Sequence, residues 1–509
     1  MVFSSFPFIF AFLPLALLGF WATARFSTRA AGVWLVLASL GFYAYWRLDF
    51  LPLLLISIAF NFTISLVLTR TESRPRLQNA VLLMGIAADL LALFYYKYAV
   101  GLSSFFGFQT VAGVPFWEIV LPLGISFFTF TQIGYLVDVK QGVAKTRDLL
   151  SYVLFVTFFP HLIAGPILHN REMMPQFADK ATYRFSGSNL AVGLTIFAIG
   201  LAKKVLLADP LAGDVALHFA HPAAGGLFAS WYAVIAYSLQ LYFDFSGYSD
   251  MAIGLARMFN IRFPLNFNSP YKATTVIDYW QRFHMTLTRF ITMYIFSPIA
   301  LWVTRWRDRH GLDNSRRASA TPGGFLSLVA GPTLITMGLA GVWHGAGTQY
   351  LIFGLLHGSY ITVNHAMRIF FPAPKKPAPK PWAVETGAHA AKVLAVYVAA
   401  LVGFAFFRAA STGAGFEILA GMAGLHGVGE ALPRTTVLQI AALFVIVWFA
   451  PNTQQIMSRY EPALGRAAVN PYRRLVWQPG AGWAFAAGTI GALGILALGG
   501  TTEFLYFQF

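Results

Sequence analysis

The sequence predicts an all-α polytopic integral membrane protein, and three observations carry this prediction. Hydrophobic residues make up 57% of the chain and charged residues only 11%, whereas a soluble chain of this length needs more charged surface. The mean hydropathy is +0.62. Apolar stretches that can supply the ~20 residues needed to cross a hydrocarbon core recur from end to end. We therefore expect roughly 11 to 13 spans, with re-entrant segments among them.

The expected spans follow one another along the whole chain. The first stretch lacks a basic n-region and a small-residue cleavage site, so we expect a helix there and not a signal peptide. Near the end of the sixth stretch, Lys203 and Lys204 have stems long enough to reach the membrane interface. The apolar stretches expected to form spans include residues 6–21, 31–46, 51–68, 80–95, 119–137, 190–208, 325–342, 390–407, 437–450 and 483–498.

The net charge of +16 has a topological explanation, because basic residues gather in alternate short loops and the loop at residues 101–117 carries no charge. Basic loops stay in the cytoplasm. We therefore expect an extracytoplasmic N-terminus, further cytoplasmic loops at residues 305–317 and 375–380, and no nucleic-acid partner. The basic residues of the first three such loops are Arg25, Arg29, Arg70, Arg74, Arg76, Lys140, Lys145 and Arg147.

One segment, FPAPKKPAPKP at residues 371–381, is typical of an extended linker loop, because its alternating prolines prevent a helix. We expect four parts on this basis. N-terminal transmembrane helices occupy residues 1–118, a central core occupies residues 119–370, the linker follows, and C-terminal transmembrane helices occupy residues 382–509.

Polar residues stop being sparse between Pro122 and Gly358. The motifs there mix aromatic, glycine, proline and polar residues, and backbone broken at membrane depth survives only where protein or water satisfies its polar groups. The centre of the chain is therefore expected to be a packed, partly hydrated core. The motifs are LPLGISFFTFTQIGYLVDV, FFPHLIAGPILH, LYFDFSGYSDMAIGLARMFNIRFPLNFNSPY and DYWQRFHMTLTRF.

His344 stands in an otherwise apolar or small run, GLAGVWHGAG. Ionisable residues within spans are costly and usually face a cavity. The glycines around His344 leave room for a substrate or another backbone to approach closely. Two more histidines, His284 and His357, lie in the same core. Because histidine titrates near neutrality, these three residues suggest proton transfer.

These histidines also have explanations other than proton transfer. A neutral histidine bonded across helices, with Trp343 packed beside it, is the structural alternative. A metal site is disfavoured because no H-E-x-x-H or comparable spacing occurs and carboxylates are scarce nearby. The chain has no cysteine, which excludes thiolate chemistry and disulfides. It also lacks the G-x-S-x-G elbow of serine hydrolases.

Asp244 and Asp250 are six residues apart, a spacing that does not make them neighbours on one helical face. We expect them to anchor helix ends or to pair with Arg257 and Arg262.

These motifs resemble the membrane-bound O-acyltransferase family, and within it most closely the bacterial branch typified by the alginate O-acetyltransferase. The resemblance runs in order from Leu121 to the last residue, and several motifs are long. The motifs that carry it are LPLGISFFTF, FFPHLIAGPI, YFDFSGYSDMAIGLARMF, RFPLNFNSPY, YWQRFHMTLT, GVWHGAGTQYLIFGLLHG, PNTQQIM and EFLYFQF.

The resemblance implies a multispanning acyltransferase of the bacterial inner (cytoplasmic) membrane, whose catalytic core at residues 119–370 encloses a funnel or tunnel. It implies no bound cofactor and no metal. The donor substrate would be acetyl-CoA on the cytoplasmic side. The acceptor would be an extracytoplasmic polysaccharide, reached directly or through a periplasmic SGNH-like acetyltransferase partner, with the lipid bilayer as the surrounding medium.

The resemblance also implies roles for residues. His344 matches the defining histidine of the family and would act as general base. His284 matches the second core histidine and would orient or assist. His357 would be structural or line the tunnel. On chemical grounds alone, the candidates for stabilising an oxyanion are backbone amides near the glycines around His344, or Asn266 or Asn268. The other residues expected to line the tunnel are Trp343, Asp244 and Tyr248.

The chain departs from the pattern of this family at several positions, which weakens the assignment of substrate and partner more than that of the reaction. Where the family usually has W-R-R-W-H-[IM]-S-L-S, this chain has Gln281, Phe283, Thr286 and Thr288, and His161 follows FFP in place of glutamine. Two rivals stay open. One is a D-alanyl transferase of the same family that uses a carrier protein. The other is a non-enzymatic polysaccharide or acyl transporter, against which no repeat-related pair of interrupted spans is found.

Overall fold

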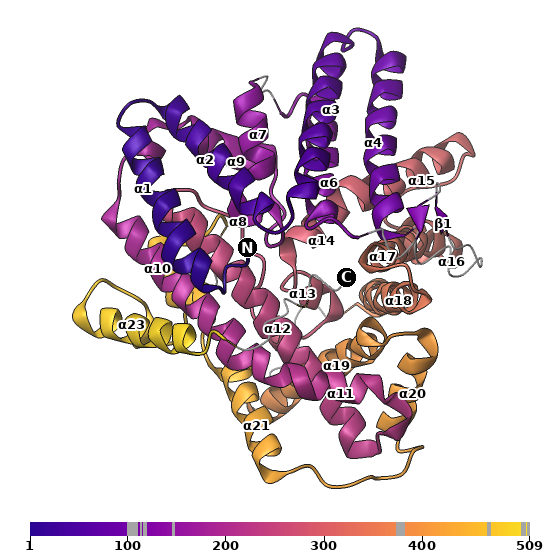
Figure 1. Cartoon of the computed structure of the whole chain (residues 1–509). Helices are drawn as coiled ribbons and strands as arrows, with labels where there is room; N and C mark the ends of the chain where they lie inside the picture. The colour runs from indigo at the N-terminus through magenta and orange to yellow at the C-terminus, as the bar shows by residue number, and fades with distance from the viewer. Residues whose placement is uncertain are drawn as a thin grey trace. The chain divides into compact units, whose positions relative to one another are not determined.

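A computed structural model gives the fold and describes residues 1–98, 110–111, 114–115, 120–144, 148–372, 382–465, 470–499 and 505. The described chain is helical almost throughout (Figure 1). Within it the strands are the short β1 (Thr110–Val111) and β2 (Val114–Pro115), which pair antiparallel. The all-α prediction is confirmed. Residues 373–381 of the expected linker, most of the uncharged loop at 101–117 and most of the final EFLYFQF lie outside the described residues.

The described helices include six that are long and apolar enough to cross a membrane. One of them, Met285–Arg309, begins in the motif DYWQRFHMTLTRF, whose polar residues argue from sequence against a lipid-facing helix. The expected total of roughly 11 to 13 spans stays a prediction. The others are Leu48–Arg70, Pro75–Lys97, Gly187–Ala220, Pro322–His344 and Trp382–Arg408, and shorter apolar helices are Phe8–Ala24, Thr28–Ala44, Arg434–Phe449 and Ala481–Leu496.

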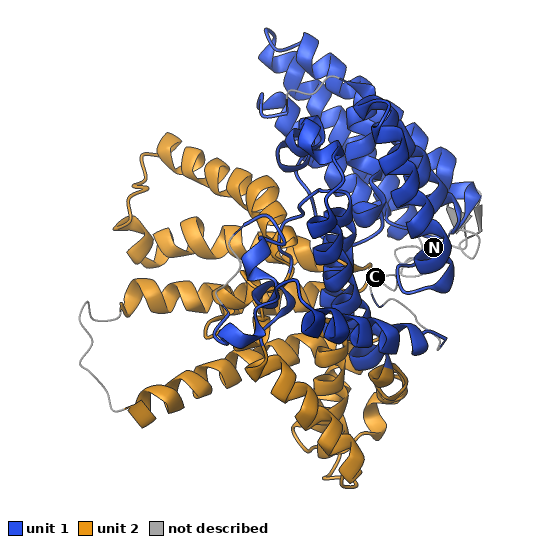
Figure 2. Ribbon diagram, turned by 90° about the vertical axis from the view of Figure 1, so that its left-hand side faces the viewer, with its two compact units in different colours: residues 1–209, 243–266, 451–508 blue, residues 210–242, 267–450, 509 orange. Residues whose placement is uncertain are grey.

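The chain forms two compact units, which divide it at different points from the four expected parts (Figure 2). The first unit comprises residues 1–209, 243–266 and 451–508, and the second comprises residues 210–242, 267–450 and 509. The long helix α12 (Leu227–Met258) supplies residues to both units. This grouping reflects compactness alone and does not test the division by function.

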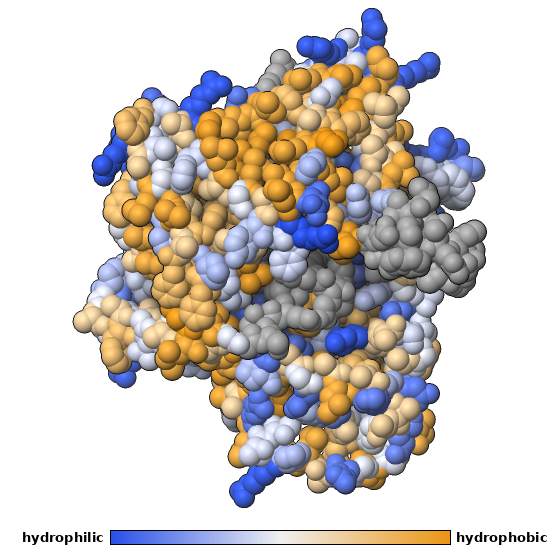
Figure 3. All heavy atoms as spheres, in the orientation of Figure 1, coloured by the Kyte–Doolittle hydropathy of each residue, from blue (hydrophilic) through white to orange (hydrophobic). Residues whose placement is uncertain are grey.

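The first unit is a bundle of apolar helices with many exposed large side chains, such as Leu18 and Ile56. Figure 3 shows such side chains, in orange, gathered over its helices, with hydrophilic residues at the loops. Its helices are η1 (Phe8–Phe12), α1 (Leu13–Ala24), α2 (Thr28–Ala44), η2 (Leu48–Phe50), α3 (Leu51–Arg70), α4 (Pro75–Lys97), α6 (Ile125–Lys140), α7 (Leu149–Thr157), α8 (Phe159–Leu162), α9 (Asn170–Ala178), η4 (Lys180–Tyr183), α10 (Gly187–Ala202), η5 (Lys203–Ala208), α22 (Thr453–Ile456), η12 (Ser458–Tyr460), η13 (Arg473–Leu475) and α23 (Ala481–Leu496).

Within the first unit, α10 and the second half of α12 touch backbone to backbone through two glycine pairs. A Cβ on Gly193 would lie 2.5 Å from the carbonyl oxygen of Gly254, and a Cβ on Gly200 would lie 2.6 Å from that of Gly247. Both helices space their glycines seven residues apart, so the pairs fall on one face of each. Small residues of this kind let membrane helices pack closely.

The aspartates of α12 are ion-paired, but not to the expected partners. Asp244 lies 2.7 Å from Lys204, and Asp250 lies 2.6 Å from Lys203. The expected pairing with Arg257 and Arg262 is therefore wrong. Both lysines follow directly on α10, and the glycine contacts bring that end of α10 against the aspartates, which a pattern within α12 alone does not reveal. The Asp250 carboxylate also accepts hydrogen bonds from Thr453 and Gln454 of the PNTQQIM motif.

The second unit is built around a helical hairpin, α17 (Gly331–His344) and α18 (Thr348–Phe370), which run side by side in Figure 1. The helix α19 (Trp382–Arg408) packs on α18. Its remaining helices are α11 (Ala212–Ala220), η7 (Pro222–Ala224), η8 (Pro270–Lys272), α13 (Val276–Trp280), α14 (Met285–Ile291), η9 (Thr292–Phe296), α15 (Ser297–Arg309), η10 (Ala318–Ala320), α16 (Pro322–Phe325), η11 (Leu326–Ala330), α20 (Thr412–Met422) and α21 (Arg434–Phe449), with η6 (Asp209–Leu211) at its boundary.

Hydrogen bonds of Tyr271 fix the position of the NSPY segment, residues 268–271, within this unit. The Tyr271 hydroxyl donates to the carbonyl oxygen of Ser238 at 2.7 Å, and the Trp448 indole donates to the carbonyl oxygen of Tyr271 at 3.0 Å. The Ser238 hydroxyl in turn lies 2.6 Å from the hydroxyl of Tyr397 on α19. These bonds tie η8 to α12, α19 and α21, so the chain that leads into α13 starts from a fixed point.

Candidate active site

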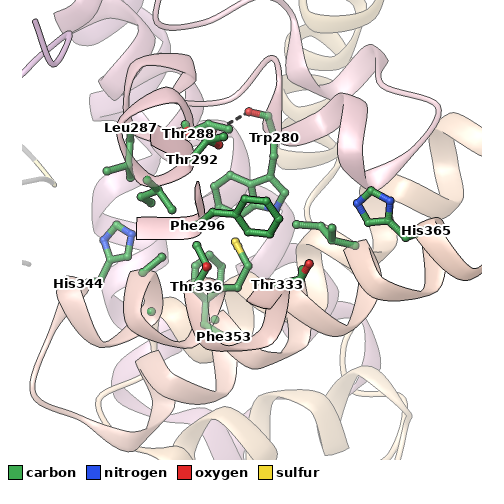
Figure 4. Close-up of a pocket in the computed structure, with 16 residues that line it drawn as sticks. Trp280, Leu287, Thr288, Thr292, Phe296, Thr333, Thr336, His344, Phe353 and His365 are labelled. Atoms are coloured by element: carbon green, nitrogen blue, oxygen red, sulfur yellow. Dashed lines mark hydrogen bonds between the residues drawn. The ribbon is translucent and has the colours of Figure 1, made fainter. Parts of the chain in front are cut away.

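A cavity of about 190 Å³ lies along the α17–α18 hairpin of the second unit. His344 stands at one end of it and His365 at the other (Figure 4). The wall is mostly apolar, with hydroxyl groups at a few points. The lining residues are Trp280, Leu287, Thr288, Ile291, Thr292, Phe296, Thr333, Thr336, Met337, Ala340, Gly341, His344, Phe353, Gly354, Ile361 and His365.

The α17 wall is one face of a helix. Its lining residues occupy positions 333, 336, 337, 340, 341 and 344, which are steps of three and four along the chain. The neighbouring helix approaches closely because both backbones carry glycine at the crossing. A Cβ on Gly341 would lie 2.3 Å from the carbonyl oxygen of Tyr350, and one on Gly354 would lie 2.2 Å from that of Met337. Of the two expected reasons for Gly341, the approach of another backbone is therefore confirmed.

His344 is the last residue of α17, and Gly345 ends the helix. A Cβ on Gly345 would lie 2.3 Å from the Tyr350 ring, so the packing of that ring against the turn leaves room for glycine. The His344 side chain is 8% exposed. Its imidazole meets the rings of Trp343 at 4.7 Å and Phe407 at 4.8 Å, both edge to face. These contacts hold the imidazole at the end of the cavity. Trp343, expected to line the tunnel, packs beside the imidazole and is not among the residues that line this cavity.

Four threonines line the cavity, and the hydroxyl groups of three of them donate hydrogen bonds to backbone carbonyl oxygens. Thr288 donates to the carbonyl oxygen of Trp280 at 2.9 Å, and Thr292 donates to that of Thr288 at 2.7 Å. Thr333 donates to the carbonyl oxygen of Val329 at 2.7 Å. The hydroxyl of Thr336 is buried and has no hydrogen-bond partner among the described residues. A buried hydroxyl without a partner raises the free energy of the folded state, so Thr336 offers a hydrogen bond to a bound molecule.

His284 lies at the junction between α13 and α14 in a left-handed backbone conformation, with φ 47° and ψ 52°. Such a conformation is strained for a residue with a side chain and is common at functional positions. Local bonds build the approach to it. Thr275 caps α13 by accepting from the Asp278 amide at 3.1 Å, and Arg282 pairs with Asp278 at 2.8 Å. His284 is 2% exposed and is not among the residues that line the cavity.

The other residues expected to line the tunnel fall into two groups. In the second unit, the backbone N–H of Asn268 donates to the carbonyl oxygen of Arg282 at 2.9 Å, close in sequence to His284. In the first unit, the Asn266 amide donates to the Ser249 hydroxyl at 2.9 Å, Asp244 pairs with Lys204, and Tyr248 stacks on Phe3 at 4.7 Å between ring centres. His357 lies behind the cavity wall and not in it.

Comparison with known proteins gives the family. Residues 125–309 match the model of the membrane-bound O-acyltransferase family. The chain is 36% identical over 453 residues to the peptidoglycan O-acetyltransferase of Helicobacter pylori, a match that covers 83% of this chain and 79% of that protein. The chain belongs to the membrane-bound O-acyltransferase family. It is an O-acyltransferase and a multi-pass membrane protein.

Further relatives differ in the acyl group that their names give. The chain is 36% identical over 458 residues to the "probable alginate O-acetylase" of Azotobacter vinelandii, which covers 87% of this chain and 83% of that protein. It is 29% identical over 241 residues to the teichoic acid D-alanyltransferase of Bacillus subtilis, which covers 47% of this chain and 58% of that protein. Acetyl and D-alanyl, the two acyl groups that the sequence leaves open, thus both appear in the names of its relatives.

Several residues that line the cavity were not predicted from the sequence. Thr333 and Thr336 lie eleven and eight residues before His344, and counting back along the helix by threes and fours finds both. Thr288, named only as a departure from the family pattern, lines the cavity. His365 and Trp280 carried no signal of their own, because their place depends on how α13 and α18 pack.

Proposed function

We propose that this O-acyltransferase moves an acetyl group from acetyl-CoA on the cytoplasmic side to a polysaccharide on the extracytoplasmic side of the bacterial inner membrane. The polymer receives the acetyl group directly or through a periplasmic SGNH-like acetyltransferase. His344 acts as the general base. The observation that carries the proposal is the place of His344 at the end of an apolar cavity, in a chain whose relatives over most of its length bear the names of O-acetyltransferases.

The chemistry needs little beyond position and a base. A thioester is already activated, so the protein must bring the acceptor hydroxyl to the acyl carbon, remove its proton and stabilise the oxyanion. The hydroxyl oxygen bonds to the acyl carbon while His344 takes the hydroxyl proton. The C–S bond then breaks, and the thiolate leaves with the proton that His344 returns. The apolar wall supports this chemistry because it keeps out water, which competes for the thioester.

The charge pattern favours a cytoplasmic donor. The basic loop at residues 305–317 precedes the helices that lead into α17, and Arg368 stands near the end of α18. Basic segments beside spans stay in the cytoplasm. We therefore place the start of α17 and the end of α18 on the cytoplasmic side. On this assignment His365 marks the cytoplasmic end of the cavity. His344 lies deeper, at the far end of α17, whose 14 residues at 1.5 Å per residue make a helix about 20 Å long.

Transfer of D-alanyl from a carrier protein is the second candidate, favoured by the partial match to teichoic acid D-alanyltransferases. It would use the same base and the same cavity. The acyl group recovered from the polymer separates the two candidates.

The test is a deletion strain complemented with the wild type or with His344→Ala. We expect the wild type to restore acetyl esters on the extracellular polymer and the variant to lower them at least 100-fold, because general-base catalysis contributes about 10²–10⁴ in rate. Membrane levels of both proteins are compared by immunoblot. Equal restoration would refute the role of His344 as base. A polymer carrying D-alanyl and no acetyl would replace the proposed substrate.

A further inference from the structure

His357 is sealed behind the cavity wall. It lies on α18 and is 1% exposed. Four aromatic rings enclose its imidazole, with centre-to-centre distances of 4.7 Å to Phe353, 5.1 Å to Trp280, 5.7 Å to Tyr360 and 6.3 Å to Tyr279. Because it does not line the cavity, a reacting group there would not meet it. Its action on the reaction has to pass through a neighbour.

Trp280 is that neighbour, since its indole N–H donates to Nδ1 of His357 at 3.3 Å. An indole N–H is a donor only, so Nδ1 must be the acceptor. The imidazole is therefore neutral in this bond, with its proton on Nε2. A protonated ring carries N–H on both nitrogens and has no lone pair to offer Trp280.

Trp280 forms part of the cavity wall beside Thr288 (Figure 4). It is held at two points. Its carbonyl oxygen accepts from the Thr288 hydroxyl at 2.9 Å, which fixes the backbone, and its indole nitrogen binds His357, which fixes the side chain. Without the second bond the indole is free to turn about its side-chain torsions, and the cavity changes shape with it.

The Nε2 edge of the His357 ring lies against Gly403 of α19. A Cβ on Gly403 would lie 2.6 Å from Nε2, so only glycine leaves room for the imidazole. Nε2 itself has no hydrogen-bond partner among the described residues. Burying an N–H without a partner raises the free energy of the folded state. The packing of the ring and the bond at Nδ1 must offset that cost.

We propose that His357 is a positioning residue, which accepts a hydrogen bond from the Trp280 indole and so sets the wall of the cavity that ends at His344. This inference rests on the proposed function for its assay but concerns a different residue from the base. It places no proton transfer on His357.

The test is a double-mutant cycle measured as kcat/KM for acetyl transfer from acetyl-CoA in membrane vesicles. His357→Leu removes the acceptor, and Trp280→Phe removes the donor. We expect each to lower kcat/KM about ten-fold, the effect of losing one buried hydrogen bond together with its geometry. The kcat/KM of the double variant should be no more than about two-fold below that of the less active single variant. Each single substitution already removes the same hydrogen bond, so the two losses do not add.

His357→Asn is the conservative control, because its side-chain oxygen takes the place of Nδ1 as an acceptor but does not titrate near neutrality. We expect it to keep kcat/KM within about three-fold of the wild type and to leave the pH profile unchanged. If His357→Leu does not accumulate, Gly403→Ala takes its place, since the added Cβ displaces the imidazole without entering the cavity.

Three results would overturn the proposal. His357→Asn as inactive as His357→Leu would show that the acceptor at Nδ1 is not what matters. A shifted pH profile in His357→Asn would show that His357 titrates during the reaction. Additive losses in the double variant would show that His357 and Trp280 act separately. Absence of transfer by the wild type itself would instead contradict the proposed donor, which the vesicle assay detects before any variant is compared.

Discussion

Thr336 shows at the scale of one residue how the cavity differs from a merely apolar gap. Its hydroxyl is buried without a partner among the described residues, whereas that of Thr333, one turn earlier, is bonded to its own helix. We expect Thr336→Val to raise KM for the acyl donor about two- to ten-fold, the value of one hydrogen bond, and not to lower thermal stability. Steady-state kinetics and thermal unfolding in detergent measure both. Thr333→Val is the matched control, and an equal rise in its KM would contradict the assignment.

The candidate site was predictable from sequence to the extent that single residues carry a signal. His344 stood out because a titratable ring in an apolar run is costly, and the structure places it at a cavity. Lys204 as the partner of Asp244 was not predictable, because the pairing depends on how α10 crosses α12. The role proposed for Trp280 was not predictable either, because it depends on a contact with His357, 77 residues further along the chain.

At the scale of secondary-structure elements, the α17–α18 hairpin depends on glycine at its crossing point. A Cβ on Gly341 would collide with backbone at 2.3 Å, whereas one on Gly338, a turn earlier, meets only flexible leucine side chains at 3.5 Å. We expect Gly341→Ala to lower the free energy of unfolding by about 1–3 kcal/mol through overpacking. Gly338→Ala should be neutral or stabilising, because alanine favours helix.

Thermal unfolding in detergent and the yield of folded protein compare these two variants directly. Equal behaviour of Gly341→Ala and Gly338→Ala would mean that the crossing is looser than the geometry indicates. Gly341→Ala should also lose activity, since Gly341 lines the cavity.

Element positions were predictable where a helix is apolar on all sides. The stretch expected at residues 51–68 is α3 (Leu51–Arg70), and that expected at 80–95 is α4 (Pro75–Lys97). The prediction was weaker where polar residues face protein. In the span Met285–Arg309, the Thr292 hydroxyl donates to the carbonyl oxygen of Thr288, and the Thr288 hydroxyl donates to that of Trp280 just before the span. The 32 residues of α12 form one continuous helix through glycine and aspartate. Hydropathy records composition and does not record which polar groups are satisfied inside the fold.

At the scale of the whole molecule, the absence of cysteine from the sequence makes the predicted topology testable by single-cysteine labelling. The positive-inside pattern places the loops around Arg74 and Arg316 in the cytoplasm and the loop around Arg47 outside. We expect Arg74→Cys and Arg316→Cys to react with a membrane-impermeant maleimide only in inverted vesicles. Leu48→Cys should react in intact cells, because Leu48 is 68% exposed and adjoins the loop that is predicted to be external. Labelling of Arg316→Cys from outside would reverse the α17–α18 hairpin, so that the His365 end of the cavity would face the acceptor and not the donor. Labelling of Arg74→Cys from outside would refute the extracytoplasmic N-terminus. The wild type, having no thiol, is the control in which no labelling is expected from either side.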